Sequence, residues 1–147
     1  MARLDRTKRV DPAQADSYAE LGRRLLHAGR AIVERGDPRH ASALAILSIH
    51  AAIAFTDAVA IHAGGRKSTS PDHEAALRVL RAVLGPRLPQ RVERVLQRVI
   101  AEKDRLEYQG YLATMGEAAS LFERAGQVAA WAEELLTSVR RTDARRS

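Results

Sequence analysis

Residues 41–65 read ASALAILSIHAAIAFTDAVAIHAGG, and this stretch decides the fold. Its apolar residues lie on nearly every face of a helix, so a helix formed here must be covered on most of its sides. Gly64 and Gly65 mark its end, because helices commonly stop at glycine. The stretch is long enough to span a bilayer, but alanine is its commonest residue and it carries several polar side chains. We therefore expect the central helix of a soluble bundle, or a helix buried in a subunit interface.

Four further helices are expected around this one, each opened by residues that favour a helix start. The start signals along the whole chain are Asp11-Pro12, Asp37-Pro38, Ser70-Pro71-Asp72, Pro89 and the capping-box sequence of residues 114–117. Gly22 and Gly29 share one side of the first helix, where a close approach of another helix would offset their cost of roughly 1 kcal/mol each. No strand alternation of useful length is present. The sequence predicts an all-α fold, an up-and-down bundle of four long helices plus one shorter helix.

The charge of the chain is concentrated at its two ends. The 147 residues carry a net charge of +6, of which residues 1–10 and 138–147 contribute +3 each, while residues 11–137 hold 16 basic and 16 acidic residues. We expect a basic N-terminal tail at 1–10, one helical bundle at 11–139 and a basic C-terminal tail at 140–147. Such tails are either solvated ends or arms that bind phosphate. The chain has no cysteine and no recognisable targeting segment, so we expect a cytoplasmic protein. We also expect no cofactor and no membrane contact.

The fourth predicted helix carries a row of arginines. Four of them fall within an arc of about 60° on a helical projection: Arg91, Arg94, Arg98 and Arg105. Residues 78–105 hold 8 basic residues against three acidic ones, a local charge of +5. An arginine row at this spacing can follow a phosphate backbone, and it can equally be a solvated face with ion-pair partners on neighbouring helices.

A second candidate for anion binding is the polar segment GGRKSTS at residues 64–70. Arg66 and Lys67 supply two cations there, beside two glycines and three hydroxyl groups. The segment lacks the spacing of a Walker A loop and does not follow a predicted strand. It is either a phosphate site or an ordinary connecting loop.

His50 and Asp57 lie seven residues apart on one side of the central apolar helix. A buried aspartate needs a partner, because an unpaired charge in the core costs several kcal/mol. His50, or an arginine of the fourth helix, is the expected partner. The pair is either a polar network that fixes the register of the helices or a polar site in a groove of the bundle. No metal site is expected, since histidine and acidic residues show no metal-binding spacing.

Three segments resemble the HEPN superfamily, the nucleotide-binding helical domains of higher eukaryotes and prokaryotes. They are SIHAAIAFTDAVAIHAGG at 48–65, GGRKSTSPDHEAALRVL at 64–80 and EKDRLEYQGYLAT at 102–114. The resemblance spans residues 12–137. It implies a homodimer that binds RNA or a nucleotide, often beside a nucleotidyltransferase-type partner protein in a toxin–antitoxin or defence pair.

Active members of that superfamily are similar in carrying an arginine followed, after four to six residues, by a histidine, and they are typically metal-independent ribonucleases. The resemblance assigns the arginine to Arg105, which would stabilise charge on a phosphate. Gly110, Tyr111 and Leu112 occupy the three positions expected for the histidine. Tyr111 is the only one of them that titrates, so the resemblance implies a degenerate motif with Arg105 and Tyr111 as its catalytic candidates.

Three functional hypotheses follow. The first is a HEPN-like module that binds RNA, a nucleotide or a partner protein near Arg105. The second is an active metal-independent ribonuclease toxin, in which His50, His62 or Tyr111 carries the proton. The third is a purely structural dimeric bundle.

Overall fold

The computed structural model describes residues 6–108 and 110–146, and these residues form five α-helices and one short two-stranded ribbon. The helices are α1 (Ala15–Arg35), α2 (Ala41–Gly64), α3 (His73–Leu84), α4 (Gln90–Tyr108) and α5 (Met115–Arg146), and the strands are β1 (Thr7–Arg9) and β2 (Arg66–Ser68). Short 3-10 turns at Pro12–Gln14, Pro38–His40 and Gly85–Arg87 join them. The all-α prediction is confirmed apart from the ribbon.

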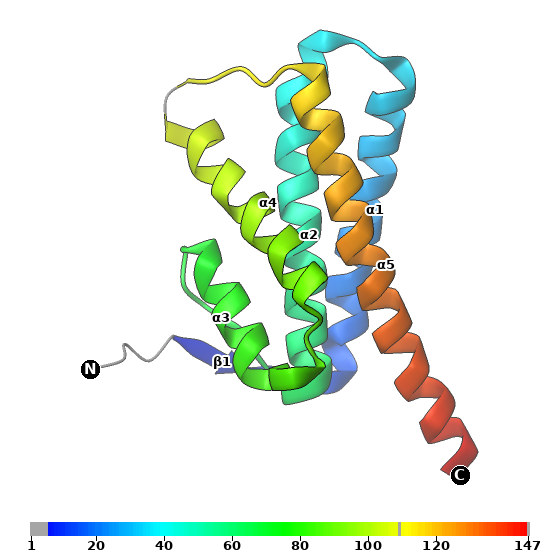
Figure 1. The fold of residues 1–147 in the computed structure, drawn as a ribbon. Helices are drawn as coiled ribbons and strands as arrows, with labels where there is room; N and C mark the ends of the chain where they lie inside the picture. The colour runs from blue at the N-terminus through cyan, green and yellow to red at the C-terminus, as the bar shows by residue number, and fades with distance from the viewer. Residues whose placement is uncertain (1–5, 109, 147) are drawn as a thin grey trace.

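The apolar helix α2 lies at the centre of the molecule (Figure 1). It packs against α1 and α5 along most of its length and against α3 and α4 on another side. Every residue from 54 to 61 is buried. Among the described residues, Pro38–Gly64 is the one stretch long and apolar enough to cross a membrane, with mean hydropathy 2.0 and 78% of its most apolar window buried. Packing inside its own bundle accounts for the apolar composition of this helix.

The helix starts and stops follow the predicted signals. Asp11, Asp37 and Asp72 each accept a hydrogen bond from the backbone N–H two residues ahead, at 2.9, 2.9 and 3.0 Å. These carboxylates satisfy amides that have no partner within the helix. Helices α1 and α2 both end on a glycine in the left-handed region, Gly36 at φ 69° and Gly65 at φ 62°.

Close packing of α1 on its neighbours confirms the expectation for its two internal glycines. A Cβ on Gly22 would lie 2.6 Å from Cε2 of Phe55 on α2, and one on Gly29 would lie 2.9 Å from Cε2 of Phe122 on α5. Both contacts are too short for a side chain larger than hydrogen, so glycine is what allows α1 to approach α2 and α5 this closely.

The ribbon corrects two predictions. Residues 7–9 are not part of a free tail, and residues 66–68 are not loop: β1 pairs antiparallel with β2. The backbone N–H of Val10 extends the pairing by donating to the carbonyl of Gly65 at 2.9 Å. Val10 is itself buried and packs with Ala15 and Ile61, so an apolar anchor holds the N-terminal strand against the bundle.

At the other end of the chain, α5 runs to Arg146, so its backbone is helical over most of the predicted tail at 140–147. The side chains of this predicted tail, and residue 147 itself, lie outside the described residues.

Candidate functional site

Arg105 and Tyr111 lie together at the corner between α4 and α5. The last turn of α4 presents Arg105, and the connection to α5 presents Tyr111. Both bind Glu117 in the first turn of α5: the guanidinium of Arg105 forms an ion pair with Oε2, and the hydroxyl of Tyr111 donates to Oε1 at 2.7 Å. The Arg105 guanidinium also stacks on the Tyr111 ring, 4.7 Å from its centre, and pairs with Glu102 at 3.3 Å. The structure therefore brings the two predicted catalytic residues together, around a carboxylate.

The predicted capping box explains why Glu117 occupies this place. The backbone N–H of Thr114 donates to Oε1 of Glu117 at 3.1 Å, and the N–H of Glu117 donates to the hydroxyl oxygen of Thr114 at 3.2 Å. This reciprocal pair opens α5 and fixes the carboxylate beside Arg105. The capping box at 114–117 is thereby confirmed.

The electrostatics of this corner favour a structural role over proton transfer. Hydrogen bonds from Tyr111 and from the backbone of Thr114 lower the pKa of Glu117 to about 2. The same Glu117 hydrogen bond raises the pKa of Tyr111 above its ordinary value, so the phenol becomes an even weaker acid. Arg105 is bound to two carboxylates, and its charge is largely neutralised. No described histidine hydrogen-bonds or stacks with Arg105 or Tyr111.

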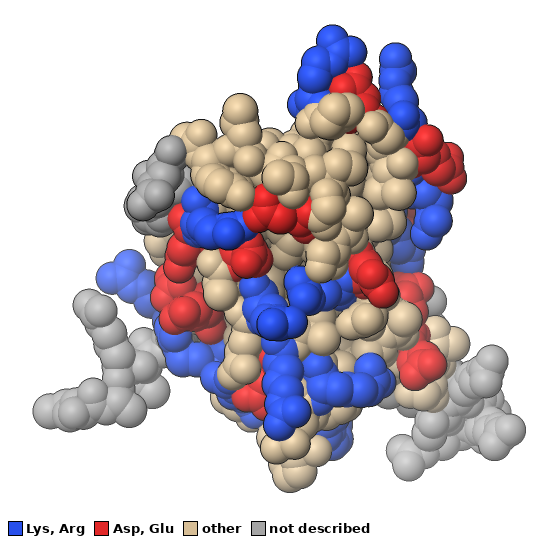
Figure 2. All heavy atoms as spheres, turned by 45° about the horizontal axis from the view of Figure 1, so that its top comes forward, with Lys and Arg blue, Asp and Glu red and all other residues tan. Residues whose placement is uncertain are grey.

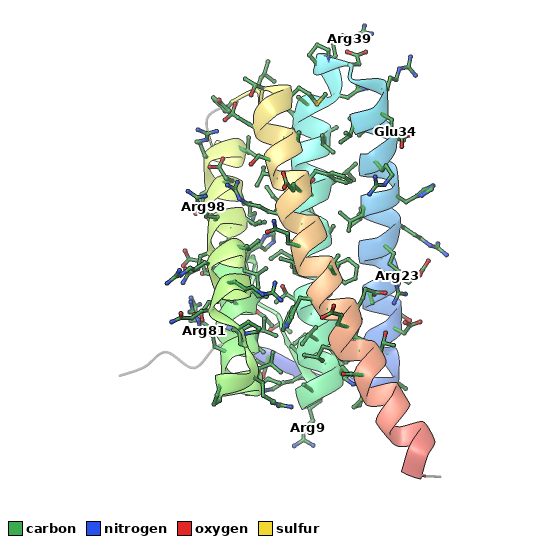
Figure 3. The ribbon with its side chains drawn as sticks, turned by 45° about the vertical axis from the view of Figure 1, so that its right-hand side comes forward. Arg9, Arg23, Glu34, Arg39, Arg81 and Arg98 are labelled. Carbon is green, nitrogen blue, oxygen red and sulfur yellow. The ribbon has the colours of Figure 1, made fainter. Side chains whose placement is uncertain are left out.

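The rest of the predicted arginine row is different. Arg91, Arg94 and Arg98 are exposed, and within the described part of the chain none of them takes part in an ion pair or hydrogen bond. Figure 2 shows basic side chains in the middle and lower part of one face, with acidic side chains beside them. Figure 3 shows Arg98 projecting away from the bundle, whereas Arg23 lies between α1 and α5, where it binds Glu133 at 2.8 Å.

A groove of about 250 Å³ runs between α3 and α4, next to this row. It is lined by Glu74, Leu77, Arg78, Arg81, Gln97 and Ile100. The two arginines of the groove are paired, because Arg81 binds Glu93 on α4 and Arg78 lies 3.7 Å from Asp72. Among the described residues, the arginines of α4 next to this groove that have no ion pair are Arg91, Arg94 and Arg98.

Asp57 is buried, with 9% of the residue exposed, and its partner differs from the predicted one. Oδ2 of Asp57 lies 3.6 Å from Nζ of Lys67 on β2, and Nζ lies 5.2 Å from the centre of the Tyr18 ring. Burial raises the pKa of Asp57 to about 6, although Lys67 and Lys8 act in the opposite direction. Neither His50 nor an arginine of α4 pairs with Asp57, because β2 places Lys67 beside this carboxylate.

His50 is exposed and belongs to a different cluster. Its ring meets that of His73, the first residue of α3, edge to face, with 5.9 Å between ring centres and 80° between planes. His50 also lines a narrow groove with Ile46, Ile49, Lys103 and Leu106. Sequence reasoning missed His73 and Lys103 here, since their positions depend on how α3 and α4 pack against α2. His62 lies elsewhere, in a small pocket with Pro12, Asp16 and Leu136.

Arg66 and Lys67, the two predicted loop cations, lie on opposite faces of β2. Lys67 is half-buried and pairs with Asp57, so it belongs to the packing of the ribbon. Arg66 lies directly opposite Arg9 in the β1–β2 ladder. No group of three or more potential metal ligands was found in the described residues.

Comparison with known proteins gives no match: no family model, no curated protein and no solved structure is significantly similar to this chain.

Proposed function

We propose that this chain is a HEPN-like RNA-binding module that holds the phosphate backbone along α4. The observation that carries the proposal is the row of three exposed arginines, Arg91, Arg94 and Arg98, that have no ion pair among the described residues. Arginines with a structural task in this protein are paired, as Arg23, Arg81 and Arg105 are.

The geometry of the row suits phosphates better than bases. Along a helix that rises 1.5 Å per residue, Arg91, Arg94 and Arg98 are offset by about 4.5 and 6 Å. Guanidinium groups bind phosphate oxygens through two parallel N–H donors. Residues 91–98 contain no aromatic side chain on which an unpaired base would stack. We therefore propose contacts that position RNA without reading its sequence.

The test is RNA binding measured by fluorescence anisotropy with a labelled single-stranded oligonucleotide. The variant carries Arg91→Gln, Arg94→Gln and Arg98→Gln together. We expect its affinity to fall roughly tenfold or more, since each lost charged hydrogen bond contributes more than a neutral one.

The matched control carries Arg30→Gln, Arg35→Gln and Arg124→Gln on α1 and α5, three arginines that also lack ion pairs in the described structure. It removes the same total charge and should bind RNA almost as well as the wild type. An equal loss in both variants would show that the net charge, and not the row on α4, attracts RNA.

A substitution of Arg105 distinguishes an RNA site on α4 from the site at Arg105 that the family resemblance implies. Because Glu102 and Glu117 neutralise it, we expect Arg105→Gln to leave RNA affinity unchanged. If Arg105→Gln lowers RNA affinity as much as the triple variant does, the binding site lies at the corner between α4 and α5.

The ribonuclease hypothesis is favoured by one observation, the contact between His50 and His73 beside Lys103. One imidazole would take the proton of the attacking 2′-hydroxyl group, the other would give a proton to the leaving 5′-oxygen, and Lys103 would stabilise the charge on the phosphate. RNA cleavage in EDTA that is lost in His50→Ala and kept in His27→Ala would support this second candidate. Intact RNA after incubation with the wild type would exclude it.

A further inference from the structure

The β1–β2 ribbon brings four cations together in six residues. The register places Lys8 opposite Lys67 and Arg9 opposite Arg66. Like charges directly opposite each other on neighbouring strands are destabilising. Negative charge from outside the two strands would therefore stabilise this ribbon.

The hydrogen-bond pattern shows how close the two arginines come. Val10 donates to Gly65, and Thr69 donates to Arg6, each at 2.9 Å, so the positions 10:65 and 6:69 are hydrogen-bonded pairs. Pairs alternate along an antiparallel ladder, which makes Lys8:Lys67 hydrogen-bonded and Arg9:Arg66 non-hydrogen-bonded. Residues of a non-hydrogen-bonded pair lie closest, with Cα atoms about 4.5 Å apart.

The two cation pairs lie on opposite faces of the ribbon, because successive side chains of a strand alternate. The lysine face is turned toward the bundle, where the buried carboxylate of Asp57 balances it: Lys67 lies 3.6 Å away, and the charge of Lys8 also acts on the Asp57 carboxyl group. A carboxylate of the bundle thus already supplies the negative charge that this pair needs.

The arginine face has no such balance. Arg9 is exposed and points away from the bundle at the end of the molecule (Figure 3), and Arg66 is half-buried. In the described structure neither guanidinium has a carboxylate partner. Thr7, two residues before Arg9, places an exposed hydroxyl group on the same face.

From this arrangement we propose that the face of the β1–β2 ribbon that carries Arg9 and Arg66 binds a phosphate group, held between their two guanidinium groups. A phosphate offers several acceptor oxygens and negative charge, which match two planar donor groups that approach from neighbouring strands. The ligand is either inorganic phosphate, a phosphate monoester or a phosphodiester of RNA, and all of them present this chemistry. The site is separate from α4 and does not depend on the RNA-binding proposal.

The experiment is a titration of the full chain with inorganic phosphate, monitored by the amide chemical shifts in NMR spectra. Phosphate replaces chloride in the buffer, so that the ionic strength stays constant. We expect saturable shifts at residues 7–9 and 66–68. Arg9→Gln and Arg66→Gln should each weaken the apparent Kd roughly tenfold. The control is Arg35→Gln, which removes one unpaired exposed arginine from the end of α1 and should leave the Kd unchanged.

Shifts that rise without saturation, or the same Kd in the wild type and in both ribbon variants, would overturn the proposal. In each variant, amide shifts of Tyr18 and Asp57 that equal those of the wild type show that the ribbon still packs against the bundle. A second titration adds single-stranded RNA to the phosphate-saturated protein carrying the α4 triple substitution. If RNA displaces phosphate, the amide shifts of residues 7–9 and 66–68 change again, which identifies a phosphodiester as the ligand. If these shifts stay as they are, the ligand is free phosphate or a monoester.

Discussion

At the scale of single residues, Asp57 shows how burial and charge oppose each other. Its position among apolar residues of α2 made it a predictable buried carboxylate. Its partner was not predictable, because the position of Lys67 depends on the pairing of β2 with β1, a strand near the N-terminus. The balance between burial and the lysines leaves the pKa of Asp57 raised to about 6.

This raised pKa predicts a pH dependence of stability. Between the ordinary value of 3.8 and about 6, the folded state binds more protons than the unfolded state. The free energy of unfolding therefore falls by at most about 3 kcal/mol as pH rises through this window. Above the window it stays constant. Urea unfolding at a series of pH values should show this fall in the wild type and lack it in Asp57→Asn. Parallel pH profiles for the two proteins would contradict the assignment.

Glu117 behaves in the opposite way. The pKa of Glu117 is about 2, so the ionised carboxylate contributes its full stabilisation above pH 4.5. This stabilisation is lost as the pH falls toward 2. Since the hydrogen bond from Tyr111 is the largest cause, Tyr111→Phe should move the Glu117 pKa back toward 4.5 in an NMR titration of the carboxyl group. Tyr18→Phe, which changes a ring that contacts Lys67, is the control and should leave that pKa where it is.

At the scale of the elements, the glycines of α1 allow a direct test of packing. Gly22→Ala places a methyl group 2.6 Å from the Phe55 ring, so we expect a loss of about 1 to 3 kcal/mol. Gly126→Ala on α5 meets nothing within 4 Å and should be neutral or stabilise by up to about 1 kcal/mol, through the higher helix propensity of alanine. Chemical denaturation of both variants measures the difference. A Gly22→Ala protein as stable as the wild type would contradict the close contact of α1 and α2.

Helix ends were predictable because their causes are local. Asp11, Asp37 and Asp72 cap the turns that follow them in the sequence, and a residue three positions away completes the capping box of Thr114. The ribbon was not predictable from the same kind of reasoning. Each strand is three residues long, carries no alternation of apolar and polar residues, and pairs with a segment far away in the sequence.

At the scale of the whole molecule, the candidate site was predictable only in part. Helical spacing alone placed Arg91, Arg94 and Arg98 on one face, and the structure leaves that face exposed. The same spacing included Arg105, whose ion pair with Glu117 depends on the path of the chain between α4 and α5. The His50–His73 contact likewise required the packing of α3 on α2.

The expected homodimer also belongs to this scale. Leu21 on α1 and Ile46 on α2 are 52% and 49% exposed, and burial of such side chains favours association. Light scattering should therefore give twice the chain mass of 16.2 kDa, and Ile46→Lys should give the single chain. A wild-type mass of one chain at every concentration would show that the dimer prediction is wrong.

The salt dependence of RNA binding is the sharpest test of a phosphate-binding site on α4, because it counts phosphate contacts. For single-stranded RNA, the plot of log affinity against log salt concentration becomes steeper by about 0.7 for each phosphate neutralised. If α4 holds the phosphates, the combined Arg91→Gln, Arg94→Gln and Arg98→Gln substitutions make the slope shallower by about 2, and the Arg30, Arg35 and Arg124 control keeps the wild-type slope. Equal slopes for the wild type and the α4 variant would contradict it.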